Sequence, residues 1–325
     1  MKNMVRESVS QRLDSVVEAI VSGRGPELAP ADAELTGLAR AASGLRGLPA
    51  EGFRQRLKDR LIASAGEGAK KPKAVREGYH TATLYLAVAG AERLVDFVKE
   101  AFGATETLRT KGSAGGLHAE VRIGDSAIMI GGYEGMTTGG TPSAIHLYVE
   151  DVDAVYQRAL EAGAASTQAP VEQPYGDREA GVRDSFGNFW YIATHRGPRY
   201  VPEGLATVNP YLHPRGAAAL IDFLKAGLGG EEVERAQSPE GVVVHAKVRI
   251  GDSVIELSEA HGPYQTMPTA IFLYVEDVDT LYERALRAGA VSTQAPSDQP
   301  YGRAGSVKDP FGTTWHLATP HKSAI

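Results

Sequence analysis

The sequence predicts an α+β fold of four βαβββ modules, arranged as two tandem copies behind a small helical N-terminal segment. Long stretches of the chain recur, and within each copy a strand, a helix and three further strands occur twice. A duplicated structural unit is the physical reading of such repeats. The recurring stretches are VRIGDSAIMI at 121–130 with VRIGDSVIEL at 248–257, AIHLYVEDVDAVYQRALEAGAASTQAP at 144–170 with AIFLYVEDVDTLYERALRAGAVSTQAP at 270–296, QPYG at 173–176 and 299–302, and DSFGNFW at 184–190 with DPFGTTW at 309–315.

Each element of the first copy has its own local signal. Strands are predicted from alternating apolar residues, and helices from apolar residues that recur every three or four positions. Gly103 and Gly163 are the stop signals of the two helices, while Asp151 is a good N-cap with Asp153 in the first turn. The predicted order is a strand at 83–88, a helix at 91–102, strands near 105–111, 117–123 and 126–131, a strand at 144–149, a second helix, and strands to about 194.

The N-terminal segment has three helical patterns, at 3–22, at 32–46 and after Pro49. It could bind a partner protein, or it could be a solvated appendage, and both interpretations stay open. Composition places a linker after it and another between the copies. The predicted division is therefore 1–64 for the helical segment, 65–77 for a linker, 78–195 for the first domain, 196–203 for a linker and 204–321 for the second domain.

Composition excludes several functions. The 325 residues contain no cysteine, so a disulfide scaffold, a thiolate metal site and a cysteine nucleophile are ruled out. Residues 1–77 carry 14 Lys and Arg against 10 Asp and Glu, whereas the remainder carries 20 against 30. An acidic main body argues against nucleic-acid binding. There is no apolar run of membrane-spanning length and no secretory signal pattern, so we expect a cytoplasmic protein that does not enter a membrane.

The repeated motifs resemble the vicinal-oxygen-chelate superfamily, which includes glyoxalases, bleomycin-resistance proteins and dioxygenases. The PhnB-like branch is the most similar. The matching motifs are the RIGDS turn, the VEDVDxxYxRAxxAGA strand and helix, and QPYG followed by DxFGxxW. The resemblance implies two vicinal-oxygen-chelate domains, in which modules curl their sheets into a cup with helices outside and a ligand inside. It specifies a fold rather than a reaction.

Strand alternation predicts which side chains face that cup. In 144–149, Ile145 and Leu147 should meet the helices, so His146 and Tyr148 should face the ligand. The same parity in the other modules places mainly aromatic residues inside. The predicted ligand-binding residues from strand parity are Tyr85, Met129, His146, Tyr148, Tyr191, Tyr211, Phe272 and Tyr274.

These positions are where metal-dependent family members carry His, Gln or Glu. Here the four modules supply Tyr85 with Met129, His146 with Tyr191, Tyr211 with Glu256, and Phe272 with His316. Any two modules therefore provide at most two common ligands, whereas a divalent ion usually takes three or more. We expect no metal and no other cofactor.

Four further side chains, in two pairs, are candidates. Arg178 and Arg303 follow the QPYG turns and could bind an anionic ligand, or they could form ion pairs with a carboxylate such as Asp184 or Asp309. Glu256 and His316, both in the second copy, could act as catalytic base and acid if they share one cup.

Three functions are compatible with these residues. The first is a metal-free binding protein for a small aromatic or polar molecule, of the drug-sequestering or resistance type. The second is a lyase or isomerase that uses Glu256 and His316, with or without an atypical divalent metal. The third is a metabolite-sensing regulator whose residues 1–64 bind a partner. A small molecule is the expected ligand in each case, and the protein is expected to be a monomer or a homodimer.

Overall fold

The computed structural model describes residues 75–321, apart from 77, 113, 114 and 138. The predicted N-terminal helices and most of the first linker lie outside these residues. The prediction that residues 1–64 bind a partner therefore also concerns residues outside the described structure. None of the described helices is long and apolar enough to span a membrane.

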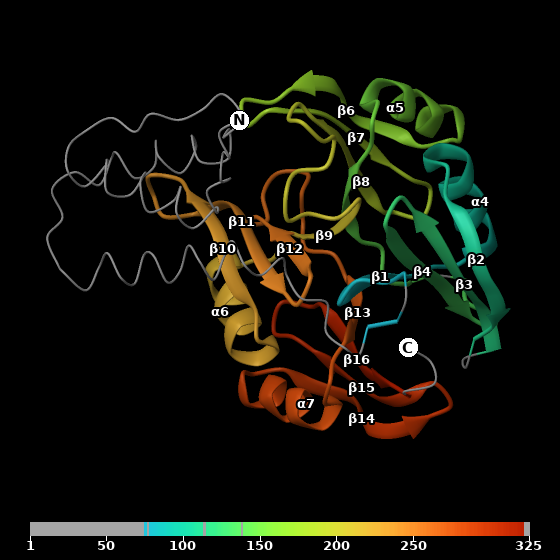
Figure 1. The fold of residues 1–325 in the computed structure, drawn as a ribbon, viewed down its shortest axis with the longest axis vertical. Helices are drawn as coiled ribbons and strands as arrows, with labels where there is room; N and C mark the ends of the chain where they lie inside the picture. Colours follow the sequence, from blue (N-terminus) through green and yellow to red (C-terminus); the bar gives the residue numbers. More distant parts are fainter. Residues whose placement is uncertain (1–74, 77, 113–114, 138, 322–325) are drawn as a thin grey trace, which may run out of the picture. The chain divides into compact units, whose positions relative to one another are not determined.

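The described part of the chain consists of four βαβββ modules, as predicted (Figure 1). Their bounds lie close to those expected from the sequence. Module 1 comprises β1 (Ala82–Ala87), α4 (Ala91–Phe102), β2 (Thr105–Lys111), β3 (Gly115–Ile123) and β4 (Ser126–Tyr133); module 2 comprises β5 (Ala144–Tyr148), α5 (Val152–Glu161), β6 (Ala165–Glu172), β7 (Asp177–Arg183) and β8 (Phe189–His195); module 3 comprises β9 (Val208–Leu212), α6 (Ala217–Leu228), β10 (Glu231–Gln237), β11 (Val243–Ile250) and β12 (Ser253–Leu257); module 4 comprises β13 (Ala270–Tyr274), α7 (Val278–Arg287), β14 (Val291–Gln299), β15 (Gly302–Lys308) and β16 (Thr314–Pro320).

The predicted helix boundaries are confirmed by their caps. The Asp151 side chain accepts a hydrogen bond from the backbone N–H of Ala154, and Asp277 does the same for Thr280. At the other end, α4 and α6 stop at Gly103 and Gly229, which have φ values of 69° and 76°. A residue without Cβ takes this left-handed conformation at little cost, so the helix ends where the sequence places glycine.

The modules form two mixed eight-stranded sheets, and each sheet takes one module from each copy. The first sheet has the strand order β14-β15-β16-β13-β1-β4-β3-β2, so it joins modules 4 and 1. The second has the order β10-β11-β12-β9-β5-β8-β7-β6, so it joins modules 3 and 2. At each junction the two modules meet through an antiparallel pair, β13 with β1 and β9 with β5. The two copies are therefore interleaved.

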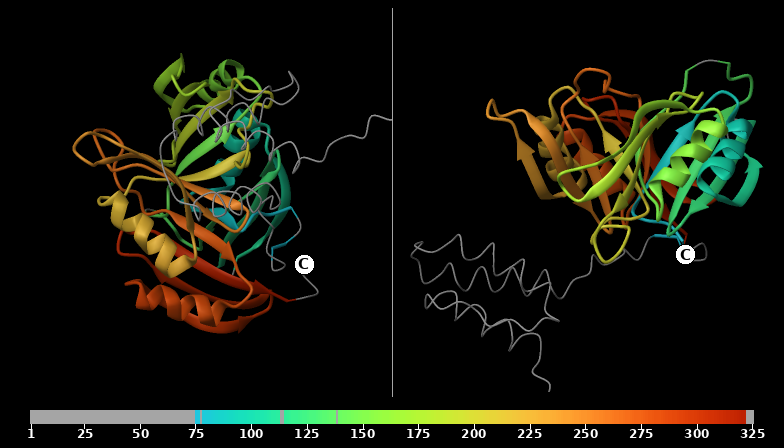
Figure 2. Two further views of the ribbon diagram at one scale, coloured as in Figure 1. Left: turned by 60° about the vertical axis from the view of Figure 1, so that its left-hand side comes forward. Right: turned by 90° about the horizontal axis from the view of Figure 1, so that it is seen from above.

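One hydrophobic core holds both sheets and the four helices together. Helices α4 and α5 pack on each other although their modules belong to different sheets, and so do α6 and α7 (Figures 1 and 2). Trp190 and Trp315 are fully buried in this core. Each indole N–H donates to a buried carboxylate, of Asp184 and Asp309 respectively, at 2.9 Å.

The two copies are also tied by a reciprocal pair of turns. In the first copy, Asp125 accepts a hydrogen bond from the backbone N–H of Thr207 at 2.9 Å, and Ser126 accepts one from Val208 at 3.0 Å. The second copy returns the same contacts to the start of β1. Asp252 accepts from the N–H of Thr81 at 2.7 Å, and Ser253 from that of Ala82 at 2.8 Å. The RIGDS turn occurs in both copies and has the same structural role in each. Each turn caps the first strand of the other copy.

His80 lies between these two turns. Its ring nitrogens are 3.3 Å from Asp252 Oδ2 and 3.8 Å from Asp125 Oδ1. The carboxylates of Asp125 and Asp252 raise the pKa of His80 to about 9, although burial opposes the shift. A protonated His80 therefore bridges the two carboxylates.

We predict that Gly124→Ala destabilises the protein more than Gly103→Ala. Both glycines have positive φ, 56° and 69°, so both substitutions strain the backbone. A Cβ on Gly124 would also lie 2.4 Å from Thr207 Oγ1, whereas a Cβ on Gly103 would meet no atom within 4 Å. We expect a loss of about 1 kcal/mol at Gly103 and of about 2–4 kcal/mol at Gly124, measured by urea unfolding. Equal losses would mean that the turn contributes nothing beyond its conformation.

We predict that His80 stabilises the fold in a pH-dependent way. Because its pKa is raised to about 9 in the folded protein, its contribution is complete below the unfolded value of 6.5 and is lost as the pH rises through about 9. His80→Ala should therefore cost roughly 2 kcal/mol at pH 6 and much less at pH 10. His261→Ala, at an exposed histidine, is the control in the same urea titrations. A loss that does not depend on pH would contradict the bridging role.

Candidate functional site

The predicted cup residues occupy the face of each sheet that carries no helix. Ile145 and Leu147 belong to the core with the helices, whereas Tyr148 packs in a separate small cluster on the other face. The residue pairs expected in each module are neighbours in register. We call the helix-free face of the first sheet site A, defined by Tyr85, Met129, Phe272 and His316, and that of the second sheet site B, defined by His146, Tyr191, Tyr211 and Glu256.

The predicted pairing of Glu256 with His316 is wrong. Glu256 lies on β12 in the second sheet and His316 on β16 in the first, because the modules pair across the copies. Nothing in the local pattern of either strand carries this information. The imidazole that reaches Glu256 is His146, which comes from the other copy.

His146 and Glu256 form the centre of site B. His146 Nδ1 lies 2.7 Å from Glu256 Oε2, and the two residues are only 6% and 1% exposed. Burial would lower the pKa of His146, but the charge and hydrogen bond of Glu256 outweigh it and raise the pKa. In the same way, the charge of His146 lowers the pKa of Glu256 against the effect of burial. Both shifts favour an ion pair between a protonated imidazole and an ionised carboxylate.

Aromatic rings surround this pair. His146 stacks beside Tyr148 with ring centroids 4.4 Å apart, and Tyr191 and Tyr211 meet edge to face at 5.2 Å. Tyr264, from the loop after β12, lies 5.9 Å from the Tyr191 ring. Sequence reasoning missed Tyr264, because strand parity says nothing about a loop.

A second hydrogen-bonded chain crosses site B. The Tyr191 hydroxyl lies 2.8 Å from His213 Nε2, and His213 Nδ1 lies 3.0 Å from Ser258 Oγ. Burial, with a smaller contribution from His261, lowers the pKa of His213 to about 4, so this imidazole is neutral. A neutral ring can accept from Tyr191 and donate to Ser258 at the same time. His213 was also missed, since it follows the end of β9.

Two further carboxylates, Asp177 and Glu179, lie in site B on β7. Asp177 Oδ1 is 2.6 Å from His195 Nδ1, and Asp177 Oδ2 accepts a hydrogen bond from Tyr148 at 3.2 Å. Glu179 accepts one from the hydroxyl of Tyr175, at 2.8 Å. Neither acid was predicted as a site residue, although the parity of β7 could have placed both.

Site A has a different lining. Tyr85 stacks on His118 with centroids 6.1 Å apart and meets His316 edge to face at 5.7 Å, while Phe272 stacks on His316 at 6.4 Å. Burial lowers the pKa of His316, so this imidazole is neutral. Of the four residues that define the site, His316 alone is a common metal ligand or proton acceptor.

The chain segment that precedes β1 fills part of site A. Val75 and Tyr79 pack with Met129 and Tyr274 in one cluster. Arg76 donates to both oxygens of the buried Glu120 carboxylate, at 2.8 and 3.3 Å, and Tyr79 donates to it as well. Burial would raise the pKa of Glu120, but hydrogen bonds from His118, Arg76 and Tyr79 hold it at about 2. Tyr274 is thus placed in site A as predicted, yet against the chain itself.

Arg178 and Arg303 are not in either site. Thr194 accepts a hydrogen bond from the first residue of α5, so its side chain lies on the helix side of the sheet. Arg178 is opposite Thr194 in the register of β7 and β8 and therefore lies on the same side. Its guanidinium donates to both oxygens of Asp153 at 2.7 Å. Arg303 binds Asp279 and Asp298 in the equivalent way. The predicted contact of these arginines with a ligand is therefore wrong, and the ion-pair alternative is right with different partners from those expected.

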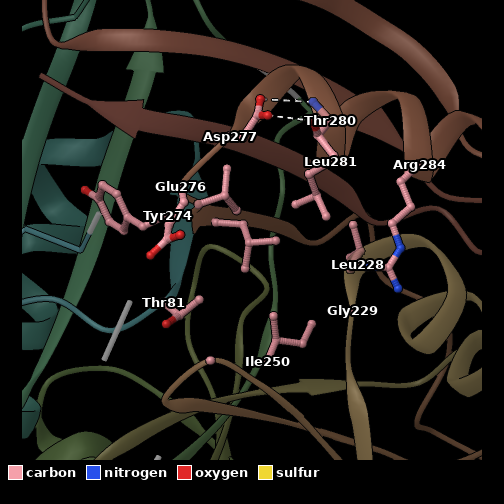
Figure 3. Close-up of a pocket in the computed structure, with 13 residues that line it drawn as sticks. Thr81, Leu228, Gly229, Ile250, Tyr274, Glu276, Asp277, Thr280, Leu281 and Arg284 are labelled. Carbon is pink, nitrogen blue, oxygen red and sulfur yellow. Dashed lines mark hydrogen bonds between the residues drawn. The ribbon is translucent and has the colours of Figure 1, made fainter. Parts of the chain in front are cut away.

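A cavity of about 680 Å³ lies on the helix side, outside sites A and B (Figure 3). Leu228, Ile250, Leu273 and Leu281 form its apolar wall, and Glu276 and Arg284 lie at its edge. In the first copy, Phe102 occupies the position of Leu228 and packs on Trp190 at 4.5 Å. Leu228 is the smaller side chain at this position and lines the cavity. Arg284 is not free there, because it donates to the carbonyls of Lys225 and Ala226 at the end of α6.

The residues of both sites fit a divalent metal poorly. At the strand positions that define the sites, site B has His146 and Glu256, which are hydrogen-bonded to each other, and site A has His316. Within the described residues, no group of three or more His, Asp or Glu side chains is placed to hold a metal ion. His146 Nε2 is buried without a partner, but a single nitrogen does not make a site.

Comparison with known sequences identifies relatives of one copy. The chain is 43% identical over 119 residues to an uncharacterised protein of Mycobacterium bovis. The matched region covers 33% of this chain and 78% of that protein. It shows the same identity over the same length to an uncharacterised protein of Mycobacterium tuberculosis, with 70% of that protein covered.

Solved structures share the fold across both copies. Glyoxalase I from Zea mays aligns with a TM-score of 0.57 and 18% identity, covering 73% of this chain and 92% of that one. A candidate dioxygenase from Bacillus subtilis aligns with a TM-score of 0.52 and 17% identity, covering 78% and 86%. At such identities the likeness concerns the fold alone. The model of one family matches residues 79–192 and 214–317. The chain therefore belongs to the glyoxalase/bleomycin resistance protein/dioxygenase superfamily, with two copies of its domain.

Proposed function

We propose that this protein is a metal-independent small-molecule-binding protein of the bleomycin-resistance type, in the PhnB-like branch of its superfamily. Its ligand is a small aromatic or polar molecule bound in site B. The main support is the lining of site B, where Tyr148, Tyr191, Tyr211 and Tyr264 surround a buried polar pair. Aromatic walls around a few fixed polar groups are typical of sites for planar ligands.

A second candidate function is acid–base catalysis of the lyase or isomerase type. The observation that favours it is the 2.7 Å contact between His146 and Glu256, in place of the expected pair of Glu256 and His316. A buried carboxylate that orients an imidazole and stabilises its charge is a recurring arrangement in general acid–base catalysis. In this candidate, His146 Nε2 would exchange the proton with the ligand, and Glu256 would position the ring.

We predict that ligands stabilise the protein through site B without a metal. In a thermal-shift screen of small aromatic compounds, a ligand at 100 times its Kd adds about 2.7 kcal/mol to the stability of the fold. The shift should persist in a chelator. Tyr211→Ala should weaken binding about tenfold by removing a stacking face, while Tyr85→Ala, the matched change in site A, should not. Stoichiometric zinc, iron or manganese in the purified protein, lost in His146→Ala, would contradict the metal-independent proposal.

We predict that Glu256 controls the titration of His146. In the wild-type protein the pKa of His146 lies above the usual value, because the nearby carboxylate outweighs burial. In Glu256→Gln only the weaker effects of the Glu179 and Asp177 charges still oppose burial, so the pKa of His146 should fall from its wild-type value. The ¹⁵N chemical shifts of labelled histidine report both titrations, and Glu172→Gln, on the exposed strand β6, is the control. An unchanged titration in Glu256→Gln would argue against the proton-transfer candidate.

A further inference from the structure

The three carboxylates of site B differ in their partners. Glu256 is bonded to His146 at 2.7 Å, and Asp177 is bonded to His195 at 2.6 Å. Glu179 accepts a hydrogen bond only from the neutral hydroxyl of Tyr175. Among the described residues, no Lys, Arg or His forms an ion pair with Glu179. Site B thus contains a carboxylate that feels the charge of His146 but makes no ion pair of its own within the described part of the chain.

The ionised form of Glu179 is costly in this environment. Burial raises the pKa of Glu179, and the nearby charges of Asp177 and Glu256 add to the effect, while His146 opposes it. A positive group placed beside Glu179 would relieve the burial cost of its charge. The position is therefore suited to a ligand that brings a positive charge.

Site A shows that the fold does not require this carboxylate. Glu179 is paired with Ala193 in β7 and β8, and Ala304 is paired with Ala318 at the equivalent place in β15 and β16. The first sheet thus has a methyl group where the second has a carboxylate. The acid is therefore a feature of site B and not of the fold that the two sheets share.

The surroundings of Glu179 are those that bind organic cations. Its charge acts on the hydroxyls of Tyr148, Tyr191 and Tyr211. The faces of such rings attract a cation, and more strongly in a desolvated site. An independent observation also indicates a missing polar partner. His146 Nε2 is buried and has no hydrogen-bond partner in the described structure, so its N–H can donate to an oxygen of a ligand.

We propose that site B recognises a planar aromatic cation that also carries an oxygen acceptor, with Glu179 as the counter-charge and His146 Nε2 as the hydrogen-bond donor. This inference rests on the proposed function, because it names the class of ligand for the same site.

Two probes of equal shape test the charge. Meta-hydroxyphenyl-trimethylammonium and meta-tert-butylphenol differ only in a positively charged nitrogen in place of a carbon, and both carry a phenol oxygen. Calorimetry on the full chain should show the cation binding at least about tenfold more tightly. In Glu179→Gln the two probes should bind equally or the neutral one more tightly. Glu172→Gln removes the same charge from the neighbouring strand β6 and should leave the preference unchanged.

The outcomes separate this inference from the proposed function. If tert-butylphenol binds as tightly as the cation and Tyr211→Ala weakens it, site B binds ligands but the cation inference is wrong. If Glu179→Gln is folded by circular dichroism and keeps the preference, Glu179 is not the counter-charge and the inference is overturned. If neither probe binds, the result contradicts the inference, and the aromatic screen described above decides the proposed function separately.

Discussion

The arrangement of the molecule depends on the reciprocal contact between the RIGDS turns and the first strands of the opposite copies. Asp125 with Ser126 holds the start of β9, and Asp252 with Ser253 holds the start of β1. These hydrogen bonds hold the first strand of each copy against the other copy, in the same arrangement in which β1 pairs with β13 and β5 with β9. The composition of each site follows from that pairing. Had each copy closed on itself, Glu256 would have faced His316, and His146 would have had no carboxylate from β12.

The two sites differ through substitutions at matched strand positions. Glu120 and Met129 in site A correspond to Lys247 and Glu256 in site B. The glutamate is therefore on the third strand of its module in site A and on the fourth in site B. In site A the acid is neutralised by Arg76 from the segment before β1. In site B it is neutralised by an imidazole that lies within the site. The core positions stay small or apolar in both copies, as at Phe102 and Leu228, because equivalent helices pack there, whereas the helix-free faces have no such constraint.

Local patterns predicted the modules, the helix caps and the faces of the strands, because these depend on neighbours within a few residues. Trp190 in the core and His146 on the helix-free face follow from strand alternation alone. Module pairing depends on contacts between residues far apart in the sequence, so the partner of Glu256 could not be deduced. The functional groups on loops, His213 and Tyr264, have no periodicity to reveal them. Arg178 was misplaced for a different reason, since one step along a strand reverses the face.

The interleaving of the copies has a consequence for a shorter chain that carried only one of them. Such a chain would leave the free edges of both β1 and β5 without a neighbouring strand, and exposed edges of this kind favour association. Two identical chains could cover all four edges by exchanging modules with each other, which would give a symmetric dimer with two identical sites. Joining the copies in one polypeptide removes that symmetry. Each site can then change its residues without altering the other, and one gene product can present two unlike binding surfaces on a single frame.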